Sequence, residues 1–99
     1  MIQSSIQAVV LSDGAGADLG VQSVSIPAGF DRLAFSTPGQ SVFMAFYESD
    51  LDNPYRRFPL TAAVSSLVIP NPKGLGTLFF KLDDSAGVLP DVVVSVMVL

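Results

Sequence analysis

The sequence predicts an all-β protein, a single antiparallel β-sandwich over residues 1–99 with seven or eight strands, either jelly-roll-like or immunoglobulin-like. Short stretches rich in Val, Ile, Phe and Leu alternate along the chain with Gly, Pro, Asp and Asn, which is typical of strands joined by turns. No segment has the apolar stripe of an amphipathic helix. A length of 99 residues suits one domain with one core.

The expected strands follow one another along the chain, each bounded by turn residues. The stretch 1–12 has two readings, an ordinary first strand or an arm exchanged between subunits. The segment near 58–62 is the least regular. The predicted strands are Ser5 to Ser12, Val21 to Ile26, Arg32 to Ser36, Ser41 to Glu48, Phe58 to Ala62, Ser66 to Ile69, Thr77 to Leu82 and Asp91 to Leu99.

Turn residues separate these strands for identifiable reasons. Asp13-Gly14-Ala15-Gly16 and Thr37-Pro38-Gly39-Gln40 supply the positive-φ and fixed-φ positions that tight turns need. The second is short enough for a hairpin, so we expect Arg32 to Ser36 and Ser41 to Glu48 to be antiparallel neighbours. Proline stands at strand ends, where a missing N–H costs no ladder bond; these positions are Pro27, Pro70 and Pro90.

Two strands are apolar on both faces. Alternation places Val42, Met44 and Phe46 on one face of the strand Ser41 to Glu48, with Phe43, Ala45 and Tyr47 on the other. The strand Asp91 to Leu99 carries Val92, Val94, Val96 and Val98 on one side and Val93, Ser95, Met97 and Leu99 on the other. We therefore expect the strand Ser41 to Glu48 to be central, with both faces covered. The strand Asp91 to Leu99 is too apolar to be a lone exposed edge, so we expect another strand or another subunit to cover it.

The composition favours binding to protein. Only 14% of the residues are charged and 49% are hydrophobic, so we expect part of a weakly charged surface to be hidden against a partner. A net charge of −4, with scattered basic residues, argues against direct binding to nucleic acid. Without cysteine there is no disulfide or thiolate metal site. The chain lacks the pattern of an export signal or a membrane span, which predicts a protein kept inside a cell, away from membranes.

Catalytic chemistry is not expected. The absence of histidine removes the commonest general base and most zinc sites. The remaining candidates are carboxylates in turn-like segments, at Asp83-Asp84 and at Glu48, Asp50 and Asp52. We therefore predict no enzymatic activity, no cofactor and no metal. The segment Glu48 to Pro54 has alternating oxygen ligands, and calcium stays open as an alternative because the Gly and distal Glu of an EF-hand are missing.

The strongest candidate contact site is the segment that follows this acidic stretch. Tyr55-Arg56-Arg57-Phe58 gathers the aromatic and arginine side chains that are enriched at interface hot spots. The alternative is an ordinary loop whose arginines pair with the nearby aspartates. The predicted interface consists of Asp50, Asp52, Tyr55, Arg56, Arg57 and Phe58.

The pattern from Val21 onward resembles a known class of protein. The run from Val21 to Phe30, with its Pro27-Ala28-Gly29 turn, leads into Leu33-Ala34-Phe35-Ser36, and later come Ile69-Pro70 and a Val-rich last strand. This succession is similar to the small β-sandwich virion proteins of tailed bacteriophages. The loop from Asp50 to Arg57 has no counterpart in that group.

The resemblance implies a virion structural protein, either a capsid decoration or cement protein or a minor head or tail component. Such a protein would be made in the host cytoplasm and reside in the virion. Its partners would be itself, as a homo-oligomer for which a trimer is one option, and the major capsid protein or another virion protein. A carbohydrate-binding sandwich using Tyr47 and Tyr55 is the main alternative, and an accessory domain of a larger enzyme ranks last.

Overall fold

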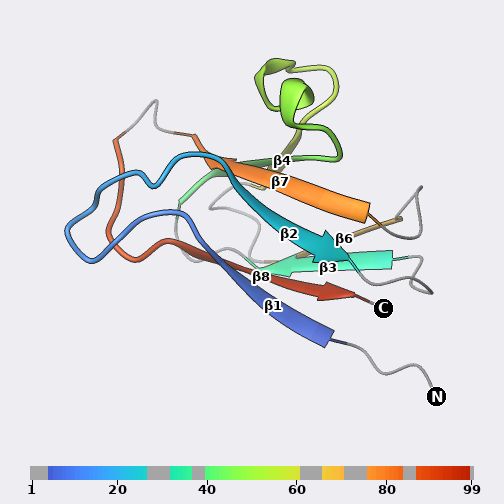
Figure 1. The fold of residues 1–99 in the computed structure, drawn as a ribbon, viewed down its shortest axis with the longest axis horizontal. Coiled ribbons are helices and arrows are strands. Elements are labelled where there is room, and N and C mark those ends of the chain that lie inside the picture. Colours follow the sequence, from blue (N-terminus) through green and yellow to red (C-terminus); the bar gives the residue numbers. More distant parts are fainter. Residues whose placement is uncertain are drawn as a thin grey trace.

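The computed structural model describes residues 5–26, 32–36, 40–60, 66–70, 76–83 and 87–98. Within them the protein is all-β, with two antiparallel sheets packed on one another and one short 3₁₀ helix, η1 (Figure 1). The elements, in order, are β1 Ser5–Val10, β2 Gln22–Ile26, β3 Arg32–Ser36, β4 Val42–Ala45, η1 Glu48–Asp52, β5 Phe58–Leu60, β6 Ser66–Pro70, β7 Gly76–Leu82 and β8 Val93–Val98.

The two sheets have related strand orders. The first sheet is four-stranded, in the order β1-β8-β3-β6, and the second is four-stranded, in the order β2-β7-β4-β5. The strands correspond in pairs that are four places apart along the chain: β1 with β5, β2 with β6, β3 with β7 and β4 with β8. Replacing each strand of the first order by its counterpart gives the second order, read backwards. The strand arrangement is therefore pseudo-twofold, with β1 to β4 as one half and β5 to β8 as the other.

The predicted hairpin between β3 and β4 is wrong. Leu33 on β3 stands opposite Ile69 on β6 and Val98 on β8, so both sides of β3 are already paired. In the same way β4 lies between β5 and β7. The chain from β3 to β4 thus passes from the first sheet to the second, and residues 37–39 of this passage lie outside the described residues.

The predicted alternation of side chains is confirmed in the core. Val94 and Val96 of β8 point inward and are almost fully buried, as are Leu33 and Phe35 of the neighbouring strand. The ring of Phe35 meets that of Phe80 from the opposite sheet edge to face, with centroids 6.0 Å apart. The cluster that joins the sheets consists of Val9, Leu11, Val24, Ile26, Leu33, Phe35, Val42, Met44, Leu60, Leu78, Phe80, Leu82, Val92, Val94 and Val96.

The strand predicted to be central lies inside its sheet, and the last strand, as expected, is not an exposed edge. β8 lies between β1 and β3, and β4 lies between β7 and β5. β1 pairs with β8 of its own chain from Ser5, opposite Val98, to Val10, opposite Val93. Residues 1–4 of the possible N-terminal arm lie outside the described residues.

Polar side chains tie the loops together at the end of the sandwich that is remote from Ser5 and Val98 (Figure 1). The buried Ser12 hydroxyl donates to the Leu89 carbonyl at 2.6 Å and accepts from the Val92 N–H at 2.8 Å. The predicted turn at Asp13 is confirmed, because its carbonyl accepts from the Gly16 N–H and its carboxylate accepts from two further backbone N–H groups. Gly16 has a φ of 81°, which favours glycine.

Candidate functional site

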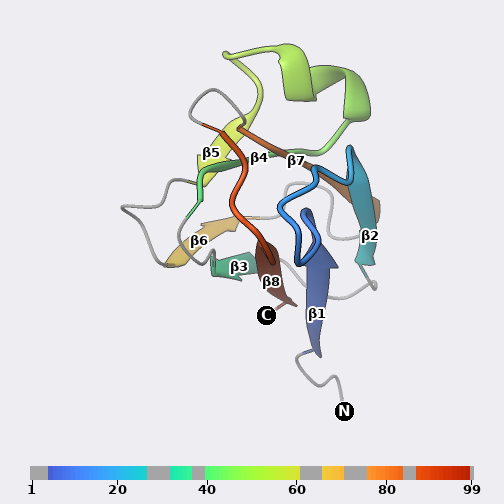
Figure 2. The ribbon, with the colours of Figure 1, turned by 90° about the vertical axis from the view of Figure 1, so that its left-hand side faces the viewer.

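The segment Phe46–Arg57, called the cap loop below, lies over the outer face of the second sheet. Figure 2 shows three layers, with the cap loop at the top, the second sheet below it and the first sheet at the bottom. η1 contacts both β4 and β7. The sequence predicted a long irregular connection between residues 48 and 66. Part of this connection is ordered and covers the second sheet.

The cap loop is held by its own backbone. The Asp50 N–H donates to the Tyr47 carbonyl, and the Asn53 N–H donates to the Asp50 carbonyl. The Asn53 carbonyl then accepts from the N–H groups of the next turn, while its side-chain oxygen accepts from the Tyr55 N–H at 3.0 Å. Asn commonly starts a turn in this way. Leu51 anchors the loop, with 1% of its surface exposed.

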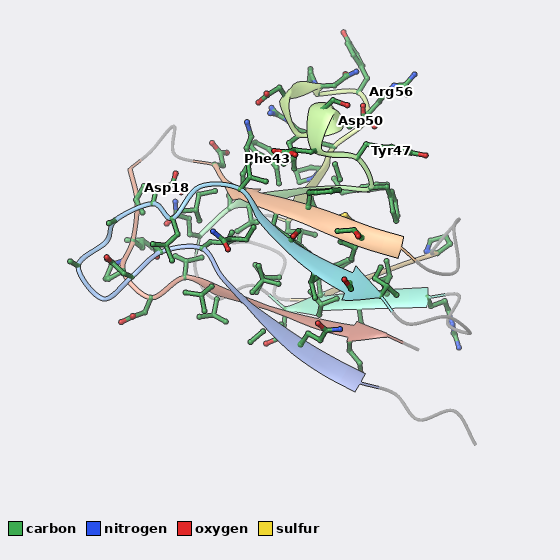
Figure 3. All side chains as sticks on the ribbon, in the orientation of Figure 1. Asp18, Phe43, Tyr47, Asp50 and Arg56 are labelled. Atoms are coloured by element: carbon green, nitrogen blue, oxygen red, sulfur yellow. The ribbon has the colours of Figure 1, made fainter. Side chains whose placement is uncertain are left out.

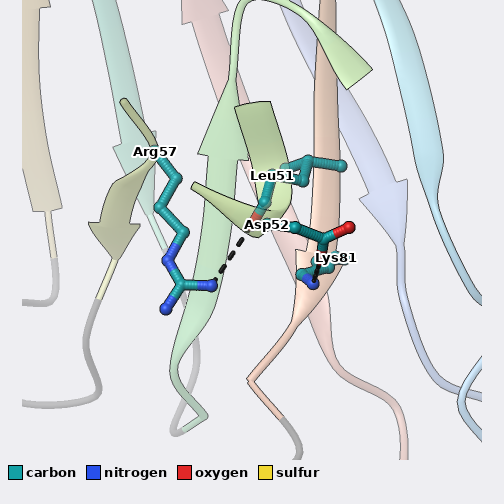
Figure 4. Close-up of polar contacts among 4 residues, drawn as sticks. All are labelled: Leu51, Asp52, Arg57 and Lys81. Atoms are coloured by element: carbon teal, nitrogen blue, oxygen red, sulfur yellow. Dashed lines mark hydrogen bonds and ion pairs between the residues drawn. The ribbon is translucent and has the colours of Figure 1, made fainter. Parts of the chain in front are cut away.

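Arg57 fastens the returning end of the loop to β4. Its guanidinium lies over the Phe43 ring, with Cζ 3.7 Å from the ring centroid, a cation–π contact. Its Nη1 also donates to the Leu51 carbonyl at 3.2 Å (Figure 4). We expected the second apolar face of β4 to be covered by the chain or by a partner. At Phe43, the chain itself covers it.

Two residues of the predicted interface therefore have internal roles. Arg57 is half-buried in the contact just described, and Phe58 is half-buried with its ring edge to face against Phe46, at a centroid distance of 5.7 Å. Phe46 and Phe58 both pack against the core. These side chains attach the cap loop to the sandwich and leave little surface for a partner.

Asp52 forms an ion pair with Lys81 of β7 (Figure 4). The hydrogen bond from Lys81 lowers the pKa of the Asp52 carboxyl, its positive charge lowers that pKa further, and the charge of Arg57 adds a smaller contribution in the same direction. In the alternative reading of this loop the arginines pair with the nearby aspartates, but the direct ion-pair partner of Asp52 is Lys81, and Arg57 acts on it only through its charge. This lysine comes from a distant strand, so sequence proximity did not indicate it.

The exposed part of the predicted site is its tip. Tyr55 is 95% exposed and Arg56 is exposed, and their side chains make no hydrogen bond or ion pair within the part of the chain that the structure describes. Tyr47 is 55% exposed on the same loop. Figure 3 shows Arg56 farthest from the second sheet and Tyr47 nearest to it, with half-buried Asp50 at a height between the two.

The calcium alternative finds no ligand cluster. Over the described ranges, no group of three or more His, Cys, Asp or Glu side chains is placed to hold a metal ion. Asp52 is turned toward Lys81, and Asp50 is half-buried.

Comparisons with protein families, curated proteins and solved structures find no match. The function of this chain therefore has to be argued from its own residues. Within the described residues, no helix is both long enough and apolar enough to cross a membrane.

A second exposed surface was not predicted as a site. The outward-facing side of the first sheet, called the bare face below, is lined by Ala8, Val10, Ala34, Val93, Ser95 and Met97. No described helix or strand lies over it, and it forms the lower surface in Figure 2. The sequence placed Val93, Ser95 and Met97 on one side of the last strand. It did not show that β1 and β3 are the neighbours of this strand, so the full set of residues on this face could not be predicted.

Proposed function

We propose that this chain is a non-enzymatic structural protein that docks on other protein through the tip of the cap loop. The observation that carries the proposal is the presentation of Tyr55 and Arg56. Both are exposed, yet they stand on a loop fixed by buried Leu51 and by Arg57. Rigid presentation lowers the entropy lost on binding, and tyrosine and arginine are favoured hot-spot residues.

The strand orders support a jelly-roll reading over an immunoglobulin-like one. Eight strands in orders β1-β8-β3-β6 and β2-β7-β4-β5 suit two interlocked Greek keys, an architecture frequent in viral capsid proteins and lectins. Immunoglobulin-type sandwiches use a different division of strands. Fold alone does not give function, but this analogy agrees with a virion decoration, cement or minor head or tail protein that also associates with itself.

Docking is tested by co-expressing the chain with the major capsid protein encoded in the same genome and sedimenting the assembled shells. We expect the chain to sediment with the shells, and the double variant Tyr55→Ala, Arg56→Ala to raise the dissociation constant from the shells at least tenfold, which is about 1.4 kcal/mol. The matched control is Gln22→Ala, which removes an exposed-surface hydrogen bond on β2. A chain that stays in the supernatant, or equal binding of both variants, would reject docking through this tip.

A carbohydrate-binding role is the second candidate, because Tyr47 and Tyr55 are both exposed on the cap loop. Tyrosine can stack on a sugar ring and offer its hydroxyl to it. A glycan array separates the two roles. Hits that disappear in Tyr55→Ala would favour sugar binding, and an array without hits would remove it.

A further inference from the structure

We infer that one end of the sandwich docks a positively charged segment of another protein that also offers apolar side chains. This end is formed by residues 11–21 and 87–92 and is called the loop end below. It lies opposite Ser5 and Val98 and away from the cap loop (Figure 1), and Figure 3 shows Asp18 there. The inference goes beyond the proposed function, because the loop end is a different surface from the tip of the cap loop.

The loop end holds the excess negative charge of the described chain. It carries the exposed carboxylates of Asp13, Asp18 and Asp91 and contains no basic residue. In the rest of the described chain, acidic and basic residues are equal in number. They are Glu48, Asp50, Asp52 and Asp83 on one side and Arg32, Arg56, Arg57 and Lys81 on the other. The potential at the loop end is therefore negative, so this end attracts cationic groups.

Large aliphatic side chains are exposed at the same end. Leu19 is 45% exposed, Val21 is 43% exposed and Leu89 is 51% exposed. Among the described residues the other exposed side chain of this kind is Val10, which adjoins the loop end from the bare face. An exposed apolar patch among polar groups is typical of an interaction surface.

Backbone hydrogen bonds bring the two segments of the loop end together. The Leu19 N–H donates to the Leu11 carbonyl at 3.0 Å, and the Leu11 N–H donates to the Val92 carbonyl at 2.8 Å. The buried Ser12 hydroxyl adds its bond to the Leu89 carbonyl. Figure 2 shows the two segments side by side. The surface is thus ordered before a partner arrives, which lowers the entropy lost on binding.

Two of the carboxylates belong to neighbouring residues of this surface. The Asp91 N–H donates to the Asp13 carbonyl at 2.9 Å, and a Cβ on Gly14 would lie 3.6 Å from the Asp91 Oδ1. The Asp13 carboxylate accepts from two backbone N–H groups, whereas that of Asp91 makes no hydrogen bond or ion pair within the part of the chain that the structure describes. Like charges repel at short range. A lysine or arginine of the partner would relieve this repulsion.

The charge of the loop end selects the class of partner. A second loop end or a nucleic acid would add negative charge to negative charge. A basic protein segment neutralises the carboxylates, and its apolar side chains remove Leu19 and Leu89 from water. Charge complementarity of this kind gives specificity and a fast association rate more than high affinity.

A synthetic peptide of repeated Lys-Leu-Gly units serves as the probe. It is titrated into the isotope-labelled chain at physiological ionic strength, and amide chemical shifts are followed. We expect saturable shifts confined to residues 11–21 and 87–92, and weaker binding as NaCl is added. A Glu-Leu-Gly peptide should not bind, and a Lys-Ser-Gly peptide should bind at least about threefold more weakly, because it cannot cover the apolar side chains.

The double variant Asp18→Asn, Asp91→Asn removes two charges and should raise the dissociation constant of the Lys-Leu-Gly peptide about tenfold. Asparagine can still accept the bond from the Gly20 N–H, and it tolerates the positive φ of residue 91. The matched control is Glu48→Gln, Asp50→Asn, which removes the same charge from the cap loop. It should change the dissociation constant by less than about twofold, because charges beyond a Debye length are screened.

The absence of saturable shifts, equal effects of the two charge variants, or equal affinity for the Lys-Leu-Gly and Lys-Ser-Gly peptides would overturn the inference. Self-association of the wild-type chain that the Asp18→Asn, Asp91→Asn variant lacks would also overturn it, because the loop end would then bind a second copy. Circular dichroism confirms that each variant is folded. Shell binding is scored separately with the Tyr55→Ala, Arg56→Ala variant, so either proposal can fail without the other.

Discussion

At the scale of single residues, the side chain of Gln40 joins loops from distant parts of the chain. It is 6% exposed. Its Nε2 donates to the carbonyls of Asp83 and Gly87, at 3.2 and 2.9 Å, and its Oε1 accepts from the Leu89 N–H at 2.7 Å. Every polar atom of the amide is thus paired, which is the condition under which a buried amide is tolerated.

We predict that Gln40→Leu lowers the free energy of unfolding by about 2–3 kcal/mol, because a backbone N–H and two carbonyls lose their partner in a part-buried site. Urea denaturation followed by circular dichroism measures the change. The matched control is Gln22→Leu, whose amide makes one exposed hydrogen bond to Leu19 and should cost less than about 0.5 kcal/mol. Similar losses in the two variants would contradict the structural role of Gln40.

The ion pair between Asp52 and Lys81 predicts a dependence of stability on pH. Because the folded-state pKa of Asp52 lies below its ordinary value of 3.8, the pair stabilises the folded protein above that value. The stabilisation is lost as the pH falls through the lowered pKa. We expect Asp52→Asn to reduce Tm slightly at pH 6, and the difference from wild type to shrink as the pH falls through the lowered pKa of Asp52.

Thermal unfolding at several pH values checks this expectation. Asp50→Asn is the control, since it leaves Lys81 with its partner. A difference between wild type and Asp52→Asn that persists unchanged at the lowest pH would show that the carboxylate is not the stabilising form. The effect should be small, because the Asp52 side chain is 84% exposed.

At the scale of elements, the cap loop depends on one apolar anchor. We predict that Leu51→Ala lowers the free energy of global unfolding by about 2–4 kcal/mol, if the cap loop unfolds together with the sandwich. Amide exchange in residues 46–57 should also become faster. Tyr55→Ala, which removes an exposed side chain from the same loop, should change stability by less than about 0.5 kcal/mol. Hydrogen exchange with mass spectrometry distinguishes the two, and unchanged protection in Leu51→Ala would mean that the loop is held by other contacts.

The strands were predictable from sequence, but their partners were not. A period of two places Val94 and Val96 inward whatever lies beside them, so the faces could be read directly. The strand limits were less accurate, because the predicted strand Ser41 to Glu48 ends at Ala45 and the chain enters η1 at Glu48. A short connection after β3 indicated a hairpin, yet it crosses between sheets because both sides of β3 are already paired. This depends on strands far along the chain, and no local pattern contains it.

The same limit applies to the candidate site. Arg56 and Arg57 are neighbours of the same type, but one is exposed and the other lies on Phe43. The difference is set by the direction of the turn after Asn53, which the sequence pattern does not specify. Of the aromatic and arginine cluster, Arg57 and Phe58 support the loop, while Tyr55 and Arg56 are exposed.

At the scale of the whole molecule, the two halves of the chain have related strand orders. Among the described residues, a further layer lies over the outer face of the second sheet but not over that of the first. The outer side of the second sheet bears Asp52, Arg56 and Arg57 of the cap loop and Lys81 of β7, whereas the outer face of the first sheet presents alanine, valine, serine and methionine, with Arg32 at the end of β3. The molecule has one charged side and one apolar side.

The pairing of β1 with β8 also decides how the fold responds to tension. Because Ser5 stands opposite Val98, a pull applied to the two ends of the described chain acts on the same end of one antiparallel ladder. The hydrogen bonds of such a ladder run perpendicular to its strands, so they open one after another, as in a zipper, instead of sharing the load. Tension between the two ends of the described chain therefore opens the sandwich first at the β1–β8 ladder.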